Sequence, residues 1–400
     1  MTPSAPDTPQ GAAPDEEAQS QGSTGPRRQS GAGADLADVL ETVGVMVCTG
    51  AGGVGKTTTA AALAIEAAQR GRRAVVVTID PAKRLADALG LDGLTNEPGA
   101  VPGDWPGELW ALMLDTKSTF DDLIVRNAKD EDHAREILDN PFYRNVSSAL
   151  SGTQEFMAME KLHELTNDDR FDLIIVDTPP SRSALDFLEA PGALTRFLDH
   201  RLYRVITAPG KGFAKALGAT AQAFLRTVAK VVGGEVINDV VAFFQAFDGI
   251  EHGFRQRADQ VVAALSSAET AFVLVASPKK DTVTEAQWFA DRLGEAGIGV
   301  RALVVNRMHP RPGAADPETQ ANAETLRAGA AQHAGSALGD YYQAAADLTI
   351  IADREEGHLQ ALGETVAPAP VVRVPMMSTD IHDLEGLGQL GKHLTGRSGD

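Results

Sequence analysis

The sequence predicts an α/β fold with a mostly parallel β-sheet and helices on both of its faces. Short β-branched runs recur along the chain and are separated by helical patterns, which is typical of parallel sheets. A glycine-rich turn joins the first of these runs to an alanine-rich helical pattern, and polar residues follow several of the runs. Ligands bind at the carboxyl ends of parallel strands, so these polar residues are the first candidates for a functional site.

The expected elements begin with a short helix from Leu36 to Val43, where apolar residues take helical spacing. A polar loop is expected over 308–322, followed by one alanine-rich helical stretch from Ala323 to Leu362. The expected strands are all short and apolar: Gly44–Thr49, Ala74–Ile79, Leu109–Leu114, Phe171–Val176, Ala271–Ala276, Val300–Val305 and Val371–Val374.

The chain divides into one large domain, residues 35–394, and two tails. Residues 1–34 are rich in Pro, Ser, Gly, Ala and Gln and are expected to be disordered, as are residues 395–400. Two stretches, about 117–169 and 183–267, are longer than strand connections require, and both have helical patterns. Insertions of this length and apolar character indicate a helical subdomain over the ligand-binding edge of the sheet.

The composition narrows the possible functions. The formal charge of −19 argues against a nucleic-acid-binding protein, which would carry a basic surface. No apolar run approaches the ~18 residues of a membrane span, and no signal pattern is present at the N-terminus, so we expect a cytoplasmic protein. The one cysteine, Cys48, excludes an internal disulfide, and its place in a strand pattern favours a buried small hydrophobe over a reactive thiol.

One segment, from Arg196 to Lys230, is more basic than the rest of the chain. It holds seven Lys and Arg residues and one acidic residue, Asp199. A solvated helical face is the ordinary explanation for such a pattern. The alternative is a surface for an acidic partner or an anionic membrane.

The stretch Gly50-Ala51-Gly52-Gly53-Val54-Gly55-Lys56-Thr57 has the pattern of a phosphate-binding loop. It lies between a predicted strand and a predicted helix, and this context argues against a glycine-rich turn that binds nothing. Glycines let successive N–H groups converge on one anion, and the helix N-terminus adds its positive dipole end. The residues expected to bind a nucleoside triphosphate are Gly50, Gly52, Gly53, Val54, Gly55, Lys56, Thr57 and Thr58.

Two aspartates at strand ends are candidates for the chemistry. Asp177 closes the Phe171–Val176 run and is expected to hold Mg²⁺ through its water shell, with Thr57 as a direct ligand. Asp80 follows the strand after the phosphate loop and could orient or deprotonate the attacking water. The alternatives are a turn residue for Asp177 and a helix N-cap for Asp80. Asn306, at the end of the sixth run, carries an amide that can pair with a purine edge.

The phosphate loop, Asp80-Pro81-Ala82 with Leu85, Asp177-Thr178-Pro179-Pro180 and Val304-Val305-Asn306 together resemble the ArsA family. That family includes the arsenite-pump ATPase and the guided-entry ATPases that deliver tail-anchored membrane proteins. The likeness runs from about residue 40 to 390 and is greatest to the ArsA-like ATPases that actinobacteria often encode as a neighbouring pair.

The resemblance implies a P-loop NTPase fold, a dimer and ATP hydrolysis with Mg²⁺. It implies that Lys56 and Thr57 bind nucleotide and Mg²⁺, that Asp80 is the switch I catalytic carboxylate, and that Asp177 opens switch II. It also implies that Asn306 and the loop after Pro375 hold adenine, and that the helical subdomain handles clients.

Three departures from the family pattern matter for function. Ala51 stands where the family usually has a signature lysine that reaches the partner's phosphates, and switch II reads Ser181-Arg182-Ser183 instead of Thr-Gly-His. The cysteines that bind zinc or arsenite in the family are absent, and a soft metalloid needs thiolates, so arsenite pumping is disfavoured.

The first hypothesis is a dimeric, Mg·ATP-driven switch that acts on an apolar client or a membrane partner. Its partner would be a second copy or a paralogous subunit that supplies the lysine missing at Ala51, unless Lys83, Arg84 or Arg182 supplies the charge within the chain. The second hypothesis is a regulatory or scaffold subunit that hydrolyses little ATP. A partitioning ATPase ranks last, because those usually have Asp-x-Asp where this chain has Asp80-Pro81-Ala82.

Overall fold

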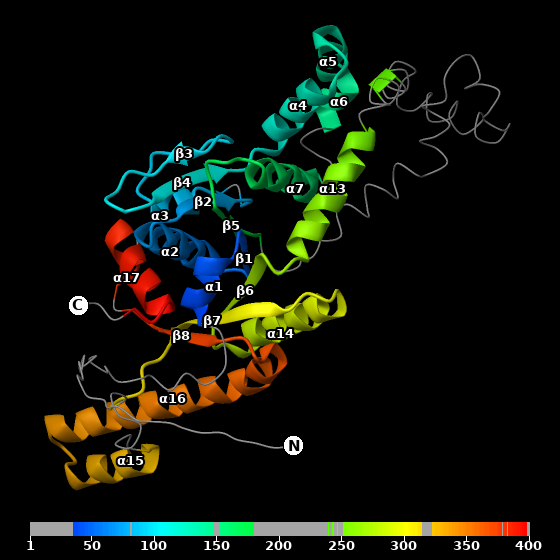
Figure 1. Cartoon of the computed structure of the whole chain (residues 1–400). Helices are drawn as coiled ribbons and strands as arrows, with labels where there is room; N and C mark the ends of the chain where they lie inside the picture. The colour runs from blue at the N-terminus through cyan, green and yellow to red at the C-terminus, as the bar shows by residue number, and fades with distance from the viewer. Residues whose placement is uncertain are drawn as a thin grey trace, which may run out of the picture. The chain divides into compact units, whose positions relative to one another are not determined.

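One eight-stranded sheet organises the part of the chain that the computed structural model describes, in the order β3-β4-β2-β5-β1-β6-β7-β8 (Figure 1). All neighbouring strands are parallel except the short pair β3 and β4. The strands are β1 (Val45–Gly50), β2 (Arg73–Thr78), β3 (Gly99–Ala100), β4 (Glu108–Met113), β5 (Leu173–Asp177), β6 (Thr270–Ala276), β7 (Val300–Met308) and β8 (Val371–Pro375). The predicted α/β fold is confirmed, and each expected run forms a strand; β3 was not predicted.

The described residues are 35–80, 82–146, 153–179, 239, 242, 243, 246, 251–313, 322–377, 379–381 and 383–397. All of them belong to one unit of the chain, residues 34–400. The predicted N-terminal tail, Arg182 and the basic segment from Arg196 to Lys230 lie outside the described residues.

Helices cover both faces of the sheet (Figure 1). One face is covered by α1 (Leu36–Thr42), α2 (Lys56–Gln69), α3 (Arg84–Ala88) and α17 (Leu384–Leu394). The other is covered by α7 (Thr153–Thr166), α13 (Glu251–Leu265), α14 (Lys280–Glu295) and the C-terminal part of α16 (Ala337–Val366). Alternate strand residues therefore enter different cores, because successive side chains of a strand point to opposite faces.

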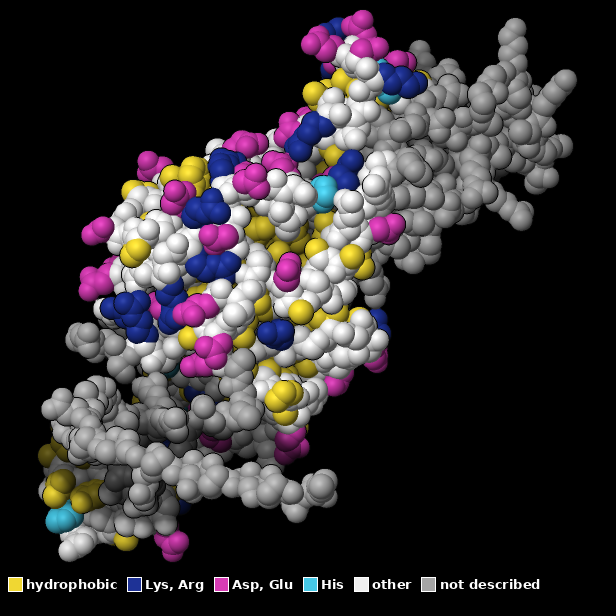
Figure 2. Space-filling model, in the orientation of Figure 1, with side chains coloured by type: hydrophobic (Ala, Val, Ile, Leu, Met, Phe, Trp, Pro, Cys, Tyr) yellow, Lys and Arg dark blue, Asp and Glu magenta, His cyan; other side chains and the backbone are white. Residues whose placement is uncertain are grey.

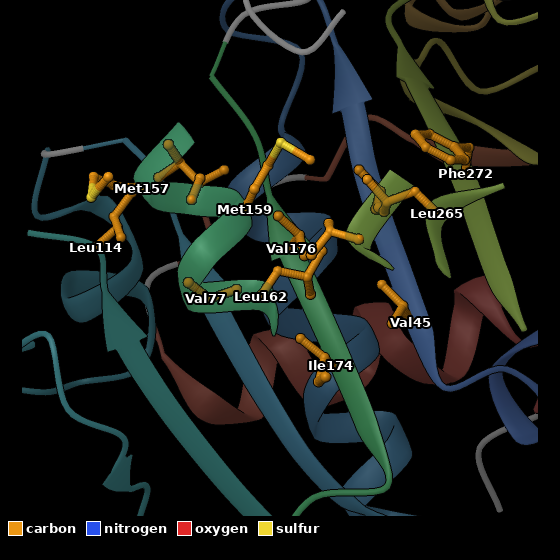
Figure 3. Packing of buried hydrophobic residues seen from close by; sticks show 14 of the residues in the cluster. Val45, Val77, Leu114, Met157, Met159, Leu162, Ile174, Val176, Leu265 and Phe272 are labelled. Carbon is orange, nitrogen blue, oxygen red and sulfur yellow. The ribbon is translucent and has the colours of Figure 1, made fainter. Parts of the chain in front are cut away.

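The core on the α7 side is seen in Figure 3, where Met157, Met159 and Leu162 of α7 pack over the valines and isoleucines of the central strands. In β1, Val45 belongs to this core, whereas the next residue, Met46, belongs to the core under α2. Both faces of the sheet are buried, which explains why its strands read as continuous apolar runs rather than alternating ones.

The C-terminal helix α17 packs closely on α2. A Cβ at Gly391 would lie 2.7 Å from the carbonyl oxygen of Ala62, so glycine permits this approach. Beyond the helix, the Thr395 hydroxyl donates a hydrogen bond of 3.1 Å to the fully buried Glu66 carboxylate, and Thr395 is 4% exposed. Packed chain thus reaches residue 395, the first residue of the predicted C-terminal tail, whereas residues 396 and 397 are exposed.

The first predicted insertion, about 117–169, holds α4 (Thr116–Asn127), α5 (Glu131–Leu138), α6 (Pro141–Val146) and α7. Phe243, from the second predicted insertion, is buried and stacks on Tyr143 of α6 with ring centroids 5.9 Å apart. Arg257 of α13 pairs with the buried Glu160 of α7 at 2.7 Å. Residues from the two insertions therefore pack against each other.

The alanine-rich region after residue 322 is not one helical stretch, as the sequence predicted, but two helices: α15 (Ala323–Gln332) and α16. The chain turns at Gly335, whose φ of 77° is unfavourable for other residues. Ser336 then caps α16, because its side chain accepts a hydrogen bond from the Gly339 N–H. Alanine favours helix on both sides of the turn, so composition alone did not reveal the break.

The cysteine, the helix lengths and the surface charges can be compared with the predictions from composition. Cys48 is fully buried, as predicted, and burial raises the pKa of its thiol. Within the described ranges, no helix has the length and apolar character needed to cross a bilayer. On the face shown in Figure 2, Lys and Arg side chains lie among Asp and Glu side chains.

Candidate nucleotide site

The phosphate loop connects β1 to α2, and its backbone path depends on glycine at two positions. A Cβ at Gly50 would lie 2.0 Å from the Val275 carbonyl oxygen of β6. Gly55 has a φ of 101°, and a Cβ there would lie 2.3 Å from Nδ2 of Asn306. Helix α2 begins at Lys56, within the last part of the loop, so its unpaired N–H groups and positive dipole end lie at the loop.

Lys56 lies inside this loop. Its side chain is largely buried, at 8% exposure, and Nζ donates a hydrogen bond of 2.9 Å to the carbonyl oxygen of Ala51. Burial lowers the pKa of the Lys56 amine, whereas the charges of Asp177 and Asp80 act in the opposite direction. The loop therefore holds a cation close to the converging backbone amides, which is the arrangement that binds phosphate.

Asp177 ends β5, the strand that lies between β1 and β2. One carboxylate oxygen, Oδ2, accepts hydrogen bonds from the hydroxyls of Thr57 at 2.8 Å and Thr78 at 3.0 Å. The other oxygen, Oδ1, is buried and has no hydrogen-bond partner among the described residues. Burial raises the pKa of Asp177 to about 6, although the two hydroxyl bonds and Lys56 oppose the shift.

A buried carboxylate oxygen without a partner is costly, and a bound cation would remove that cost. The Thr49 hydroxyl, in β1 just before the loop, is also buried, and no described residue bonds it. Hydroxyl and carboxylate oxygens are the ligands that Mg²⁺ prefers. The residues present therefore fit Mg²⁺, with Thr57 and Asp177 as the side chains that would hold it directly or through water.

Asp80 lies one residue beyond Ile79, past the end of β2, and its carboxylate is about one-quarter exposed. Oδ1 accepts a hydrogen bond of 3.0 Å from the Ala82 N–H, and Oδ2 pairs with Arg84 at 3.3 Å. The N-cap residue of α3 is Lys83, so Asp80 closes the turn before that helix rather than capping it. Arg84, one of the cations predicted to supply charge within the chain, is thus paired with Asp80.

Asn306 contacts the phosphate loop directly: its Nδ2 donates a hydrogen bond of 2.9 Å to the carbonyl oxygen of Val54. This contact leaves Oδ1 and the second amide hydrogen for the predicted purine interaction. Pro375 ends β8 beside Met308 of β7, and the next residue, Met376, donates a backbone hydrogen bond of 2.7 Å to the Met308 carbonyl. The two segments predicted to hold adenine are therefore adjacent.

Three further residues contact the site, and the sequence patterns did not identify them. Thr78 bonds Asp177 and could have been suspected as a hydroxyl at a strand end. Gln154, at the start of α7, donates a hydrogen bond of 2.7 Å to the carbonyl oxygen of Ile79. Arg307 donates a longer one, 3.4 Å, to the Gly53 carbonyl oxygen. The last two depend on tertiary contacts over 75 and 254 residues of sequence, for which no local pattern exists.

The phosphate loop follows the first strand, and an aspartate from the neighbouring strand is bonded to the loop threonine. This combination is characteristic of P-loop nucleoside triphosphatases. A family profile described as "Anion-transporting ATPase" matches residues 43–330. This match covers more than half of the chain, so the chain belongs to the ArsA ATPase family and is an ATPase. The resemblance inferred from the motifs is confirmed.

Individual relatives are distant. The chain is 27% identical over 268 residues to a protein named ATPase GET3 from Malassezia globosa, covering 66% of this chain and 73% of the relative. It is 29% identical over 270 residues to the arsenical pump-driving ATPase of Acidiphilium multivorum, covering 66% of this chain and 39% of the relative. The chain is also 29% identical over 276 residues to an arsenical pump-driving ATPase of Escherichia coli. This match covers 67% of this chain and 40% of the relative.

Proposed function

We propose that this chain binds and hydrolyses Mg·ATP at residues 50–58 and uses the cycle as a conformational switch. The observation that carries the proposal is the carboxylate of Asp177, which is bonded to the loop hydroxyl of Thr57 and has a second buried oxygen without a partner. Mg²⁺ bound there would neutralise phosphate charge during hydrolysis. Lys56 would exchange its bond to the Ala51 carbonyl for phosphate oxygens, which as charged acceptors form stronger hydrogen bonds.

The proposed catalytic carboxylate is Asp80. Its oxygens are engaged by Ala82 and Arg84, and an ion pair in which Arg84 is 68% exposed contributes little stability. A small rearrangement of residues 80–84 would free Asp80 to orient the attacking water or accept its proton. Adenine would lie against Asn306 and the segment after Pro375.

Coupling to the helical insertions would pass through Ile79. Its N–H donates to the Asp177 carbonyl at 3.1 Å, and its carbonyl accepts from Gln154 of α7 at 2.7 Å. Movement of Asp80 or Asp177 on nucleotide binding would therefore be transmitted to α7. We propose that the helices of the insertions respond in this way and handle an apolar client or an anionic membrane partner. Arsenite is not the proposed client, since the one cysteine, Cys48, is buried.

We propose that the working form in the cytoplasm is a dimer, with a paralogous subunit or with a second copy. Ala51 is 2% exposed and contributes no charge to a partner's site. The same residue favours the alternative function, a subunit that binds ATP, hydrolyses it slowly and regulates a hetero-oligomer.

Isothermal titration calorimetry on Lys56→Ala tests the site assignment. We expect severe loss of Mg·ATP affinity, because the loop loses its only basic side chain. The control is Lys117→Ala, an exposed lysine on α4 that pairs with Asp121 and should leave binding unchanged. Equal ATP affinity in wild type and Lys56→Ala would overturn the proposal.

A further inference from the structure

Arg307 has a backbone conformation that arginine rarely adopts. Its φ is 65°, and among the described residues it is the one non-glycine residue with a positive φ. This left-handed region is sterically unfavourable for a residue with a long side chain, and glycine is its usual occupant. At the same place the pairing of β7 with β8 shifts register, between Val305 and Met308. The strand is distorted at its carboxyl end, beside the nucleotide site.

The distortion brings two consecutive side chains onto the phosphate loop. Asn306 bonds the Val54 carbonyl at 2.9 Å, and the Arg307 guanidinium donates to the Gly53 carbonyl at 3.4 Å. The bond to Gly53 is at the outer limit of hydrogen-bond length, and Arg307 is exposed, so this contact is easily exchanged. A strained backbone that persists at a ligand site indicates that the side chain is needed there.

Arg307 forms no ion pair with a residue in the described part of the chain. Within the described ranges, no carboxylate lies at ion-pair distance from it, whereas the nearby Arg311 pairs with Asp353 and Arg373 pairs with Glu356. The phosphate loop itself contains one basic residue, Lys56. A second cation, with no carboxylate from the described residues at ion-pair distance, therefore contacts the phosphate loop that contains Lys56.

We propose that Arg307 is a second cation of the nucleotide site, which leaves the Gly53 carbonyl and binds a phosphate oxygen when ATP is present. The inference rests on the proposed function, because it concerns the same nucleotide. A phosphate oxygen is a charged acceptor, so its bond to the guanidinium is shorter and stronger than the bond to a backbone carbonyl. Because the bond to phosphate is stronger, Arg307 would contribute to the affinity for ATP. Its movement away from Gly53 would also change the contacts at the carboxyl end of β7 when ATP binds.

The test compares Arg307→Gln, Arg307→Gly and Arg307→Lys with the control Arg301→Gln, which changes an arginine at the other end of the same strand. Mg·ATP and Mg·ADP affinities are measured by calorimetry at low and high KCl, and the melting temperature (Tm) by circular dichroism. We expect Gln and Gly to weaken ATP binding about tenfold and to reduce its salt dependence, Lys to retain most of the affinity, and the control to bind like wild type.

Stability separates a charge role from a structural one. Glycine adopts a φ of 65° without steric cost, so Arg307→Gly should melt at the same temperature as Arg307→Gln or higher while binding ATP equally poorly. The inference is overturned if Gln and Gly bind ATP like wild type while Lys56→Ala does not. It is also overturned if Lys binds as poorly as Gln and all three variants melt lower. Wild type that binds no ATP would instead contradict the proposed function.

Discussion

Replacing Asp177 by asparagine should stabilise the nucleotide-free protein while removing its response to Mg²⁺. Burial raises the pKa of this carboxyl from 3.8 to about 6. A shift of about two units means that the ionised group costs ~3 kcal/mol of folding free energy above pH 6. Asparagine removes that charge and keeps an oxygen for the hydroxyls of Thr57 and Thr78. The asparagine NH₂ group would take the place of Oδ1, where it would be buried without a hydrogen-bond acceptor among the described residues, and this costs ~1–2 kcal/mol of folding free energy.

The net gain is therefore ~1–2 kcal/mol, which corresponds to a rise of about 1–3 °C in Tm for a chain of this size. The assay is thermal unfolding with EDTA at pH 7.5, followed by the same measurement with Mg·ATP. Wild type should gain stability from Mg·ATP, whereas Asp177→Asn should gain much less. The exposed Asp259→Asn on α13 is the control and should change neither quantity.

The pH dependence of stability tests the same carboxyl group. Because the pKa of Asp177 is raised in the folded state, the stability contributed by the protonated form is complete below the unfolded-state pKa and is lost as pH rises through about 6. The advantage of Asp177→Asn over wild type should thus shrink between pH 7.5 and pH 5. A variant that is less stable than wild type at pH 7.5 without Mg²⁺ would refute this account of the buried carboxylate.

Three further predictions concern charge, base selectivity and coupling. Ala51→Lys should raise the steady-state ATPase rate of the isolated chain, because a cation acting across a dimer interface can contribute ~10³–10⁵ in rate; adding a paralogue should do the same for wild type. Asn306→Ala should reduce discrimination between ATP and GTP by ~1–3 kcal/mol in competition binding, since a base edge loses its partner. Gln154→Leu should leave ATP affinity unchanged but weaken the effect of ATP on hydrogen exchange in α7, because Ile79 loses its contact with that helix.

Each of these has a result that would contradict it. If Ala51→Lys leaves the ATPase rate unchanged and a paralogue also has no effect, then the cation at the active site is supplied within the chain, by Lys83 or Arg182. Equal loss of ATP and GTP affinity in Asn306→Ala would mean that the residue acts through the Val54 carbonyl alone. Gln360→Leu, on the exposed side of α16, is the control for Gln154→Leu, and identical exchange in both variants would remove α7 from the coupling path.

Much of the fold could be predicted because its signals are local. A strand buried on both faces is a continuous apolar run, so β1, β2, β5 and β6 were found within one or two residues of their ends. The phosphate loop is also local, since glycine spacing and Lys56 define it without reference to other segments. The positions of Asp80 and Asp177 followed, because parallel strands bring their carboxyl ends to one edge.

What could not be predicted depends on contacts between distant segments. The partner of Gln154 is a backbone carbonyl, which has no sequence signature. The left-handed conformation of Arg307 contradicts the preference of arginine, and only tertiary structure imposes it. The packed chain at Thr395 follows from the buried Glu66 of α2, whereas composition near the C-terminus suggested a tail.

The most direct test of the central claim is single-turnover release of phosphate from Mg·ATP, with protein in excess, by wild type and Asp80→Asn. The account predicts that wild type releases phosphate, and that Asp80→Asn binds ATP with unchanged affinity but releases phosphate at least ~10²-fold more slowly, as expected when a general base is lost. Phosphate release by Asp80→Asn at the wild-type rate, or none from wild type even with a paralogue present, would contradict it.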